Sequence, residues 1–270
     1  MIPRVIHYCW FGKKRKPKLV LDCIESWRNF LPDYKIVEWN ESNSDLSHHF
    51  ALEAYKKRKW AFVADIVRLQ VLYSAGGIYL DTDIILVKKL DGLLQHNCFF
   101  GAEDNQYVNC AIVGAEKGND LICEILNAYR EIIIHDKQNW ESITIPIIAT
   151  KIIKKNVTVD LDLTSTIHTP NITIYNKNYF YPLPNHLKND RANFKKYITI
   201  ETYAVHLWSS SWVEYNEYQF LKQKKYWKAL HRISINFFST KFGDVQYLKS
   251  IIRSFINSLS TFIVMLKCVN

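Results

Sequence analysis

The stretch that most constrains the fold is ADIVRLQVLYSAGGIYLDTDIIL, residues 64–86. Its first half repeats apolar residues at helical spacing and ends at Gly76-Gly77, where the left-handed end of a helix favours glycine. Its second half is an almost continuous apolar run, as expected of a buried strand. Only the tripeptide DTD interrupts that run. The stretch therefore predicts a helix, a tight turn and a strand that carries two carboxylates.

Those two carboxylates form the first candidate site. Asp81 and Asp83 would be costly inside an apolar run unless an opposite charge compensated them. At alternate positions of a strand both side chains point to the same side, and carboxylate oxygens suit Mg²⁺ or Mn²⁺. Asp65 and Arg68, three residues apart on the preceding helix, share neighbouring faces of it. We therefore expect a divalent-metal site at Asp81 and Asp83; the alternative for a D-x-D alone is a solvated turn.

The whole phrase, with D-x-x-R before the glycines and D-x-D after them, resembles glycosyltransferase family 32, the DXD-containing sugar transferases. That family includes initiating α-mannosyltransferases and capsular polysaccharide transferases, and it is distantly similar to the glucosylating domain of large clostridial toxins. The resemblance implies an α/β fold of the GT-A type, a Rossmann-like nucleotide-sugar-binding domain. It implies four catalytic residues: Asp81 and Asp83 at the metal, and Asp65 and Arg68 at the hydroxyls of the donor sugar. It also implies that Tyr79 lies near the diphosphate.

The N-terminal residues predict a strand-helix-strand unit. Residues 2–11 are apolar almost throughout and predict a strand of a parallel sheet. An amphipathic helix is expected over residues 19–31 and a second strand over residues 34–39, which is the order of a βαβ unit. The basic loop between the first strand and the helix, KKRKPK, is either a solvated loop or a lip that faces an anion at the carboxyl end of a strand.

Three further segments acquire candidate residues through the same resemblance. The opening phrase ends in Trp10, which is expected to stack on the donor base because an aromatic face suits a flat base; the alternative is a core tryptophan. His7 is expected to be a satisfied core histidine. Asn109 precedes a short strand and corresponds to an asparagine near the donor sugar.

The segment AVHLWSSSW, residues 204–212, resembles the C-terminal signature of the family. The resemblance implies that it closes over the diphosphate. His206 would then complete the metal site, since imidazole is an acceptable Mn²⁺ ligand. Hydroxyl and indole groups can hold phosphate oxygens, which gives roles to Trp208, Ser211 and Trp212. The alternatives for His206 are a structural histidine and a position behind the ligands.

Composition bounds the size and the partners of the chain. With 270 residues and 48% hydrophobic residues, a sizeable core is expected and global disorder is excluded. The six cysteines are scattered without a C-x-x-C pair, which indicates reduced thiols. The net charge of +9 suits anionic partners. Residues 217–270 hold nine Lys or Arg and two Asp or Glu, so they carry +7 of that charge.

We therefore predict a transferase domain over residues 1–213 and a basic, amphipathic helical extension over residues 214–270. The extension either binds an anionic membrane surface or packs on its own domain. Residues 164–203, rich in Pro and Asn, are expected to carry acceptor contacts. With no secretory signal at its start, the chain is expected in the cytoplasm or on the inner face of the plasma membrane.

The predicted function is a metal-dependent, retaining glycosyltransferase of surface polysaccharide synthesis. It would move a hexose from a nucleotide sugar to a glycan or a lipid-linked glycan. The expected cofactors are Mn²⁺ or Mg²⁺ and a nucleotide sugar, with a UDP-sugar favoured and GDP-mannose as the alternative; no nucleic acid is expected as a partner. The competing interpretations are a metal-dependent phosphohydrolase, which usually needs a second cluster of metal ligands, and a basic protein that binds membranes or nucleic acid without catalysis.

Overall fold

The computed structural model describes residues 1–135, 139–157, 162–209, 217–222, 225–239, 245 and 247–256. The chain divides into two compact units, unit 1 (Met1–Ser209) and unit 2 (Ser210–Asn270). The predicted domain boundary at residues 213/214 falls in a segment outside the described residues.

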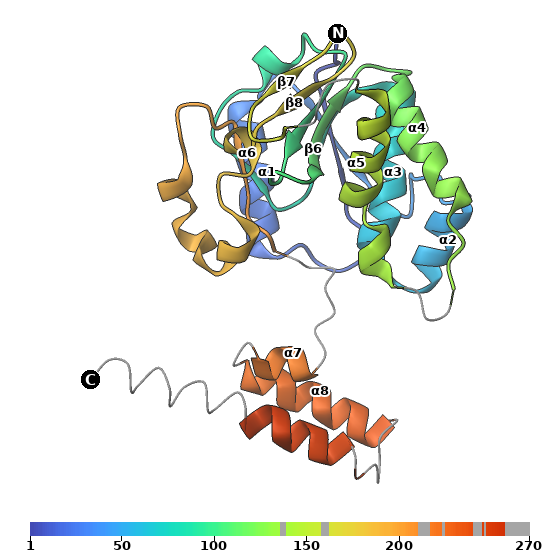
Figure 1. Cartoon of the computed structure of the whole chain (residues 1–270), viewed down its shortest axis with the longest axis vertical. Helices are drawn as coiled ribbons and strands as arrows, with labels where there is room; N and C mark the ends of the chain where they lie inside the picture. The colour runs from blue at the N-terminus through green and yellow to red at the C-terminus, as the bar shows by residue number, and fades with distance from the viewer. Residues whose placement is uncertain are drawn as a thin grey trace. The chain divides into compact units, whose positions relative to one another are not determined.

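Unit 1 contains a seven-stranded mixed sheet in the order β2-β1-β3-β6-β5-β8-β7 (Figure 1). Its strands are β1 (Val5–Cys9), β2 (Lys35–Trp39), β3 (Gly77–Leu80), β5 (Cys98–Ala102), β6 (Val108–Ala115), β7 (Ile167–His168) and β8 (Thr173–Tyr175). β1 runs parallel to β2 and β3, and β5 runs parallel to β8, whereas β6 and β7 are antiparallel to their neighbours. A separate two-stranded sheet joins β4 (Ile84–Leu86) to β9 (Ala204–His206). The predicted α/β class is confirmed.

The helices cover both faces of the sheet. They are α1 (Lys18–Phe30), α2 (His49–Lys56), α3 (Trp60–Ala75), α4 (Asp120–Ala128), α5 (Ile145–Asn156) and α6 (Lys177–Phe180), with a longer 3₁₀ segment at Asn185–Tyr197. Because β2 and β3 flank β1 on opposite sides, the crossover through α1 and the one through α2 and α3 are expected on opposite faces. Figure 1 shows this arrangement, with α3, α4 and α5 grouped on one side of the sheet and α1 on the other.

Alternating side chains of β3 supply the two halves of the core. Ile78 and Leu80 are fully buried in the half that also contains Trp27 of α1. Tyr79, between them, is buried in the other half, where it joins residues of α3 such as Ile66. A strand that is buried on both faces explains why this stretch of the sequence has no polar alternation.

The Gly76-Gly77 pair ends α3 as the sequence predicts. Gly76 has φ 68° and Gly77 has φ 118°, conformations that glycine adopts without the strain a side chain would cause. A Cβ atom on Gly77 would lie 2.7 Å from the carbonyl oxygen of Val5, so β1 and β3 can approach only at a glycine. The turn therefore places β3 directly beside β1.

The order of the strands creates a place for a ligand. In an open α/β sheet, ligands bind beyond the carboxyl ends of the strands, where the strand order reverses. Here the reversal lies between β1 and β3. The segments that follow these two strands begin with Trp10 and Asp81, and the antiparallel strand β6 begins at the same edge with Val108 and Asn109.

Candidate active site

A β-turn, not a continuous strand, carries the two carboxylates. β3 ends at Leu80, the N–H of Asp81 donates to the carbonyl of Ala111 at 2.7 Å, and the N–H of Ile84 donates back to the carbonyl of Asp81 at 3.0 Å. The predicted reason for their convergence, alternate positions in a strand, is therefore wrong. A turn with an i to i+3 hydrogen bond brings Asp81 and Asp83 together instead.

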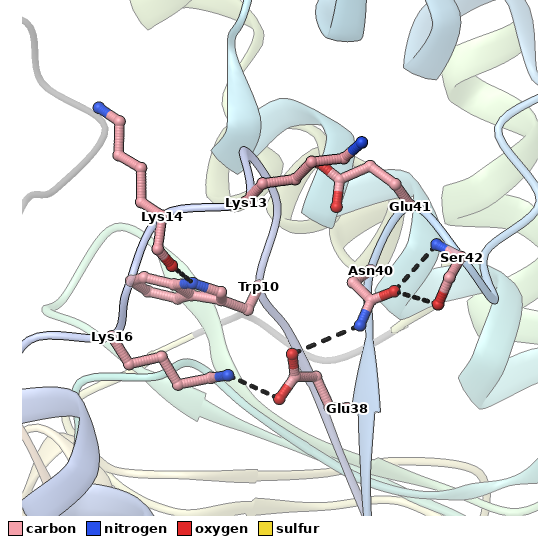
Figure 2. Close-up of a pocket in the computed structure, with 8 residues that line it drawn as sticks. All are labelled: Trp10, Lys13, Lys14, Lys16, Glu38, Asn40, Glu41 and Ser42. Carbon is pink, nitrogen blue, oxygen red and sulfur yellow. Dashed lines mark hydrogen bonds and ion pairs between the residues drawn. The ribbon is translucent and has the colours of Figure 1, made fainter.

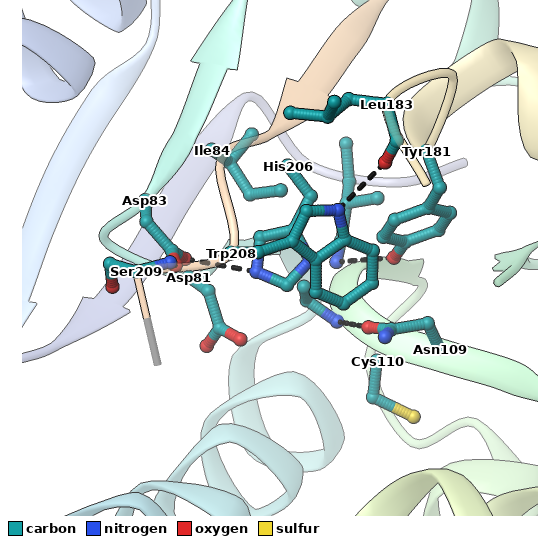
Figure 3. A network of polar contacts seen from close by, with 12 residues as sticks. Asp81, Asp83, Ile84, Asn109, Cys110, Tyr181, Leu183, His206, Trp208 and Ser209 are labelled. Carbon is teal, nitrogen blue, oxygen red and sulfur yellow. Dashed lines mark hydrogen bonds and ion pairs between the residues drawn. The ribbon is translucent and has the colours of Figure 1, made fainter. Parts of the chain in front are cut away.

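The strand that follows the turn brings His206 to this site. Ile84 pairs directly with His206 in the β4–β9 ladder, and the N–H of Leu207 donates to the carbonyl of Asp83 at 2.9 Å. This register sets the imidazole beside the carboxylate, with His206 Nε2 at 3.1 Å from Asp83 Oδ1 (Figure 3).

Asp81, Asp83 and His206 together could hold a metal ion. Each offers one ligand atom, and these atoms all lie within 4.8 Å of one another. Ligands of Mg²⁺ lie at about 2.1 Å from the ion, so two of them are at most about 4.2 Å apart, and only a small closure is required. The side chain of Asp81 is 31% exposed, whereas that of Asp83 is 10% exposed, so the cluster opens on the side of Asp81. The residues present therefore fit a hard divalent cation.

The electrostatics of the cluster also favour added positive charge. Burial raises the pKa of Asp81, and Arg68 only partly opposes that change. Burial also disfavours the charged form of Asp83, but His206 and the N–H of Ser209 outweigh it and hold the pKa of Asp83 below its usual range. Conversely, burial lowers the pKa of His206, and the attraction of Asp83 overcomes this and raises it. His206 Nδ1 is buried and has no hydrogen-bond partner among the described residues.

Arg68 lies beneath the turn and links it to α3. Its Nη2 is 2.9 Å from Asp81 Oδ1 and 3.2 Å from Asp65 Oδ1, and its Nη1 donates to the carbonyl of Cys110 at 2.5 Å. The guanidinium lies 4.4 Å from the centre of the Tyr79 ring, within the range of a cation–π contact. Arg68 is therefore placed to fix the position of Asp81.

Asp65, Arg68 and Tyr79 lie under the site rather than on an open surface. Each is at most 6% exposed. Burial raises the pKa of Asp65 to about 7, and the nearby Arg68 opposes the rise. The Tyr79 hydroxyl reaches Asp81 and favours its ionised form. Direct contacts of these three residues with the donor sugar or the diphosphate stay predictions. The contacts of Arg68 with Asp65, Tyr79 and Asp81, and that of Tyr79 with Asp81, are observed.

Trp208 supports the cluster from below and does not present its indole N–H to a ligand. The N–H donates to the carbonyl of Leu183 at 2.7 Å, and the ring lies 3.9 Å from the ring of His206, as Figure 3 shows. The expectation that this N–H holds a phosphate oxygen is therefore wrong. The main chain of Trp208 has φ 50°, and from this left-handed conformation the next N–H, that of Ser209, donates to Asp83 Oδ2 at 2.8 Å.

Several supporting residues could not be selected from the sequence. Ser209 acts through its main-chain N–H, which leaves no signal in the residue type. Tyr181 and Leu183 lie in the segment predicted to carry acceptor contacts, yet both are buried beneath Trp208. Their apolar character within a polar stretch indicates burial, but it does not indicate which residue they pack against. The other two predicted residues of this region, Ser211 and Trp212, lie outside the described residues.

Asn109 lies at the same edge of the sheet with both ends of its amide engaged. Its Oδ1 accepts from the N–H of Ala111 at 2.7 Å, and its Nδ2 donates to Glu103 Oε2 at 2.7 Å. It is 6% exposed. Ala111 belongs to β6 and its carbonyl accepts from the N–H of Asp81, so Asn109 braces the start of that strand beside Asp81. A contact of Asn109 with the donor sugar stays a prediction.

A polar pocket of about 430 Å³ lies beyond the carboxyl ends of β1 and β2 (Figure 2). Trp10 is half-buried, lines this pocket and donates its indole N–H to the carbonyl of Lys14 at 2.6 Å. Lys16 lies 5.8 Å from that ring and 2.7 Å from Glu38. Lys13, Lys14, Asn40, Glu41 and Ser42 complete the lining.

The pocket supports the interpretation of the basic loop as a lip of a ligand site. Trp10 also packs against the half of the core that contains Trp27, so both interpretations of this residue, a core tryptophan and a stacking partner for a base, stay predictions. His7 is a buried core histidine, as expected: its Nε2 lies 2.9 Å from the carbonyl of Gly76, and its Nδ1 accepts from Trp39 at 3.1 Å.

Taken together, these features define an α/β protein with an acidic cluster that could hold a cation at the end of β3 and a polar pocket, lined by Trp10, beyond the ends of β1 and β2. Residues 17–100 match the model of the glycosyltransferase sugar-binding region containing a DXD motif. The matched residues include Asp65, Arg68, Asp81 and Asp83. His206 lies outside the matched residues.

Named proteins with sequence similarity agree with this family. The chain is 27% identical to an inositol phosphoceramide mannosyltransferase of Schizosaccharomyces pombe over 130 residues, which cover 46% of the chain and 36% of that protein. It is 27% identical to an uncharacterized glycosyltransferase of Acanthamoeba polyphaga mimivirus over 224 residues, 78% of the chain and 84% of that protein. It is 26% identical to a lactosylceramide 4-alpha-galactosyltransferase of Rattus norvegicus over 158 residues, 54% of the chain and 40% of that protein.

Among solved structures, the PaToxG glycosyltransferase is similar with a TM-score of 0.48 and 18% identity, over 58% of the chain and 69% of that structure. Of the two relatives named first, the chain spans about a third of the length of the S. pombe protein and most of the length of the mimivirus protein.

Proposed function

We propose that this chain is a metal-dependent glycosyltransferase of the GT-A type that moves a hexose from a nucleotide sugar. One observation carries the proposal. Asp81, Asp83 and His206 converge within 4.8 Å at the carboxyl end of β3, and the Trp10 pocket lies beyond the neighbouring end of β1. The cluster would match the diphosphate of a nucleotide sugar and the pocket its base, both beyond the carboxyl ends of the parallel strands, where ligands bind in such sheets.

The pocket is the proposed site of the base. The face of Trp10 supplies a stacking platform, and base–aromatic stacking contributes about 1–3 kcal/mol per base. Lys13 and Lys16 at the rim supply positive charge for the ribose-phosphate side. A UDP-sugar is favoured and GDP-mannose is the alternative; the names of the S. pombe and rat relatives, a mannosyltransferase and a galactosyltransferase, keep both sugars open.

Asp81, Asp83 and His206 would hold Mn²⁺ or Mg²⁺. When bound, such a cation neutralises the diphosphate and stabilises it as a leaving group. The protein's own contribution is positioning. Arg68 and Tyr79 fix Asp81 from below, Trp208 supports His206, and Asp65 lies beside Arg68. Transfer with retention at the anomeric carbon is part of the proposal, without an assigned carboxylate nucleophile.

The proposed acceptor is a glycan or a lipid-linked glycan of surface polysaccharide synthesis, including a capsule. The S. pombe and rat relatives are named for ceramide lipids as acceptors, which supports an acceptor presented at a membrane surface. An enzyme bound to the membrane surface would encounter such an acceptor by diffusion within the plane of the membrane.

The two competing interpretations are less well supported. A metal-dependent phosphohydrolase usually uses two metals about 3.5–4 Å apart with more ligands. In the part of the chain that the structure describes, Asp81, Asp83 and His206 form the one group of three such residues. A purely basic binding protein would leave this buried acidic cluster without a purpose.

The test is Asp83→Asn, which keeps the shape of the side chain and removes its charge. Nucleotide release from the preferred donor, chosen from a panel of nucleotide sugars, is measured with and without added Mn²⁺. We expect turnover to fall by roughly 10²–10³-fold, as for the loss of one preorganised electrostatic group. Because Asp83 accepts from Ser209 and contacts His206, we expect a loss of stability of about 1–3 kcal/mol, not the gain that an uncompensated carboxylate would give.

Asp91→Asn is the matched control. Asp91 carries the same side chain and pairs with Arg4 at 3.1 Å on the exposed surface, where ion pairs contribute about 0–1 kcal/mol. We expect near-normal turnover from this variant. A folded Asp83→Asn protein that retains metal-stimulated turnover would remove the basis for the proposal.

A further inference from the structure

Unit 2 contains a small helical group with its own core. Its described helices are α7 (Glu217–Lys222), α8 (Tyr226–Ser239) and a third helix over residues 247–256, the last of the coloured helices in Figure 1. Tyr226 of α8 packs edge-on against Phe255 of the third helix, with ring centres 5.6 Å apart. Leu221, Ala229, Tyr247 and Ile251 are buried. The inward faces of the helices are therefore already occupied.

The opposite face of α8 exposes apolar side chains. Trp227 is 86% exposed and Leu230, one turn further on, is 53% exposed. Lys228 and Arg232, which share one side of this face at helical spacing, are also exposed. An indole ring that is almost fully in water next to two cations is an unusual arrangement for a surface without a partner.

The third helix repeats this pattern. Leu248, Ile252 and Ile256 follow one another at intervals of four residues and are 37%, 58% and 57% exposed, so they form one stripe along the helix. Lys249 and Arg253, also four residues apart, are exposed beside the stripe. The sequences of α8 and of residues 247–256 contain no Asp or Glu.

We propose that these two helix faces bind the surface of an anionic lipid bilayer. An apolar stripe with Trp and flanked by Lys or Arg is the composition of helices that lie in the interface of a membrane. The apolar residues would enter the boundary of the acyl chains, and the cations would contact lipid phosphates. No helix among the described residues is long and apolar enough to cross a bilayer, so the faces would lie on the membrane.

Charge argues against the other occupants of these faces. A second copy of the chain would bring Lys228, Arg232, Lys249 and Arg253 against the same cations, and like charges at an interface are unfavourable. A nucleic acid would contact the cations but would gain little from leucine and isoleucine, since stacking on bases requires aromatic or planar side chains. An anionic bilayer satisfies both the apolar and the charged residues.

This inference extends the proposed function, because a lipid-linked acceptor would lie on the same surface. Its test needs no donor, metal or acceptor, so either proposal can fail alone. The full chain is sedimented with phosphatidylcholine vesicles and with vesicles containing about 30% phosphatidylglycerol, at low and at high salt. Binding to the anionic vesicles alone, weakened by salt because screening acts within about 10 Å at 0.1 M, is the expected result.

Two pairs of variants locate the binding surface. Ile252→Ser and the double variant Lys228→Gln/Arg232→Gln should each reduce the bound fraction several-fold. The matched controls lie in unit 1: Ile200→Ser, at a side chain that is 92% exposed, and the double variant Lys154→Gln/Lys155→Gln on α5, where both lysines are exposed. The controls should bind as the unchanged protein does.

Trp227 allows a second measurement, which does not require a variant with reduced membrane binding. Brominated lipids quench the fluorescence of a tryptophan that enters the bilayer, and the quenching should be smaller in Trp227→Phe. The proposal would be overturned if the protein failed to bind anionic vesicles or bound neutral vesicles equally well. It would also be overturned if the control variants lost as much binding as the test variants, or if quenching were unchanged in Trp227→Phe. A dimer that Ile252→Ser dissociates would overturn it as well, since the faces would then bind a second copy.

Discussion

Replacing Arg68 with methionine should destabilise unit 1 by about 3–5 kcal/mol, because removal of one partner of a buried ion pair leaves the opposite charge uncompensated. Methionine retains most of the apolar stem of arginine, so the change is chiefly one of charge and hydrogen bonds. The side chain of Arg68 is 5% exposed and that of Asp65 is 8% exposed. Little water can therefore replace the guanidinium.

The structure sets the size of the effect through the number of groups that lose a partner. Arg68→Met removes the cation from Asp65 and Asp81 and the donor from the carbonyl of Cys110. A buried acceptor without a donor costs about 1–3 kcal/mol by itself. Asp81 can gain partial compensation from solvent because its side chain is 31% exposed. Solvent cannot compensate Asp65 in this way, so most of the loss of folding stability is expected to come from Asp65 and from the carbonyl of Cys110.

The assay is urea unfolding followed by tryptophan fluorescence, since six of the eight tryptophans lie in residues 1–209. Arg4→Met is the control: the same substitution at an ion pair of 3.1 Å whose side chains are 60% and 44% exposed. Such a pair contributes about 0.2–1 kcal/mol. If Arg68→Met costs no more than Arg4→Met, the guanidinium does not hold Asp81 and Asp65 in the way that the geometry indicates.

Two further predictions concern the histidine of β1 and the pocket. Burial lowers the pKa of His7 in the folded protein, so the unfolded chain takes up its proton first and folding stability should fall as the pH drops below about 6.5; in His7→Gln, which stays neutral, this part of the pH dependence should disappear from urea unfolding curves measured between pH 8 and pH 5. Trp10→Ala should weaken UDP binding by roughly 5–150-fold, the equivalent of about 1–3 kcal/mol of stacking, as titration calorimetry would measure; unchanged affinity would place the base elsewhere.

Local patterns in the sequence predicted the framework of the site well. The helix that ends at Gly76-Gly77 and the buried strand after it depend on neighbours within a few residues, and both are present. The unusual φ angles of the two glycines are also local, because the turn requires them. The convergence of Asp81 and Asp83 was expected, but for the wrong reason: the apolar run resumes directly after DTD, so the pattern does not show that the chain leaves the sheet at Asp81.

The contacts that complete the site could not be predicted, because they join segments that lie far apart in the sequence. Arg68 could pair with Asp65 on its own helix or with a carboxylate elsewhere, and only the packing of α3 against β3 shows that it contacts both Asp65 and Asp81. The use of the Trp208 indole N–H likewise depends on Leu183, which lies 25 residues earlier. A tryptophan in a motif carries no signal of which group its N–H meets.

The balance of charge at the site gives one further reason to assign it to a divalent cation and a diphosphate. The raised pKa values of Asp65, Asp81 and His206 favour protons at the end of β3. A divalent cation would replace those protons: with all three carboxylates ionised and His206 neutral, the charge of Arg68 leaves two negative charges, which the cation would cancel. A diphosphate then adds negative charge beside the cation, on the side where the KKRKPK loop follows β1. Because Lys13, Lys14 and Arg15 are exposed on that loop, their charge is available to the diphosphate. The acidic cluster and the basic loop would thus suit opposite charges of the proposed ligand, a metal-bound nucleotide sugar.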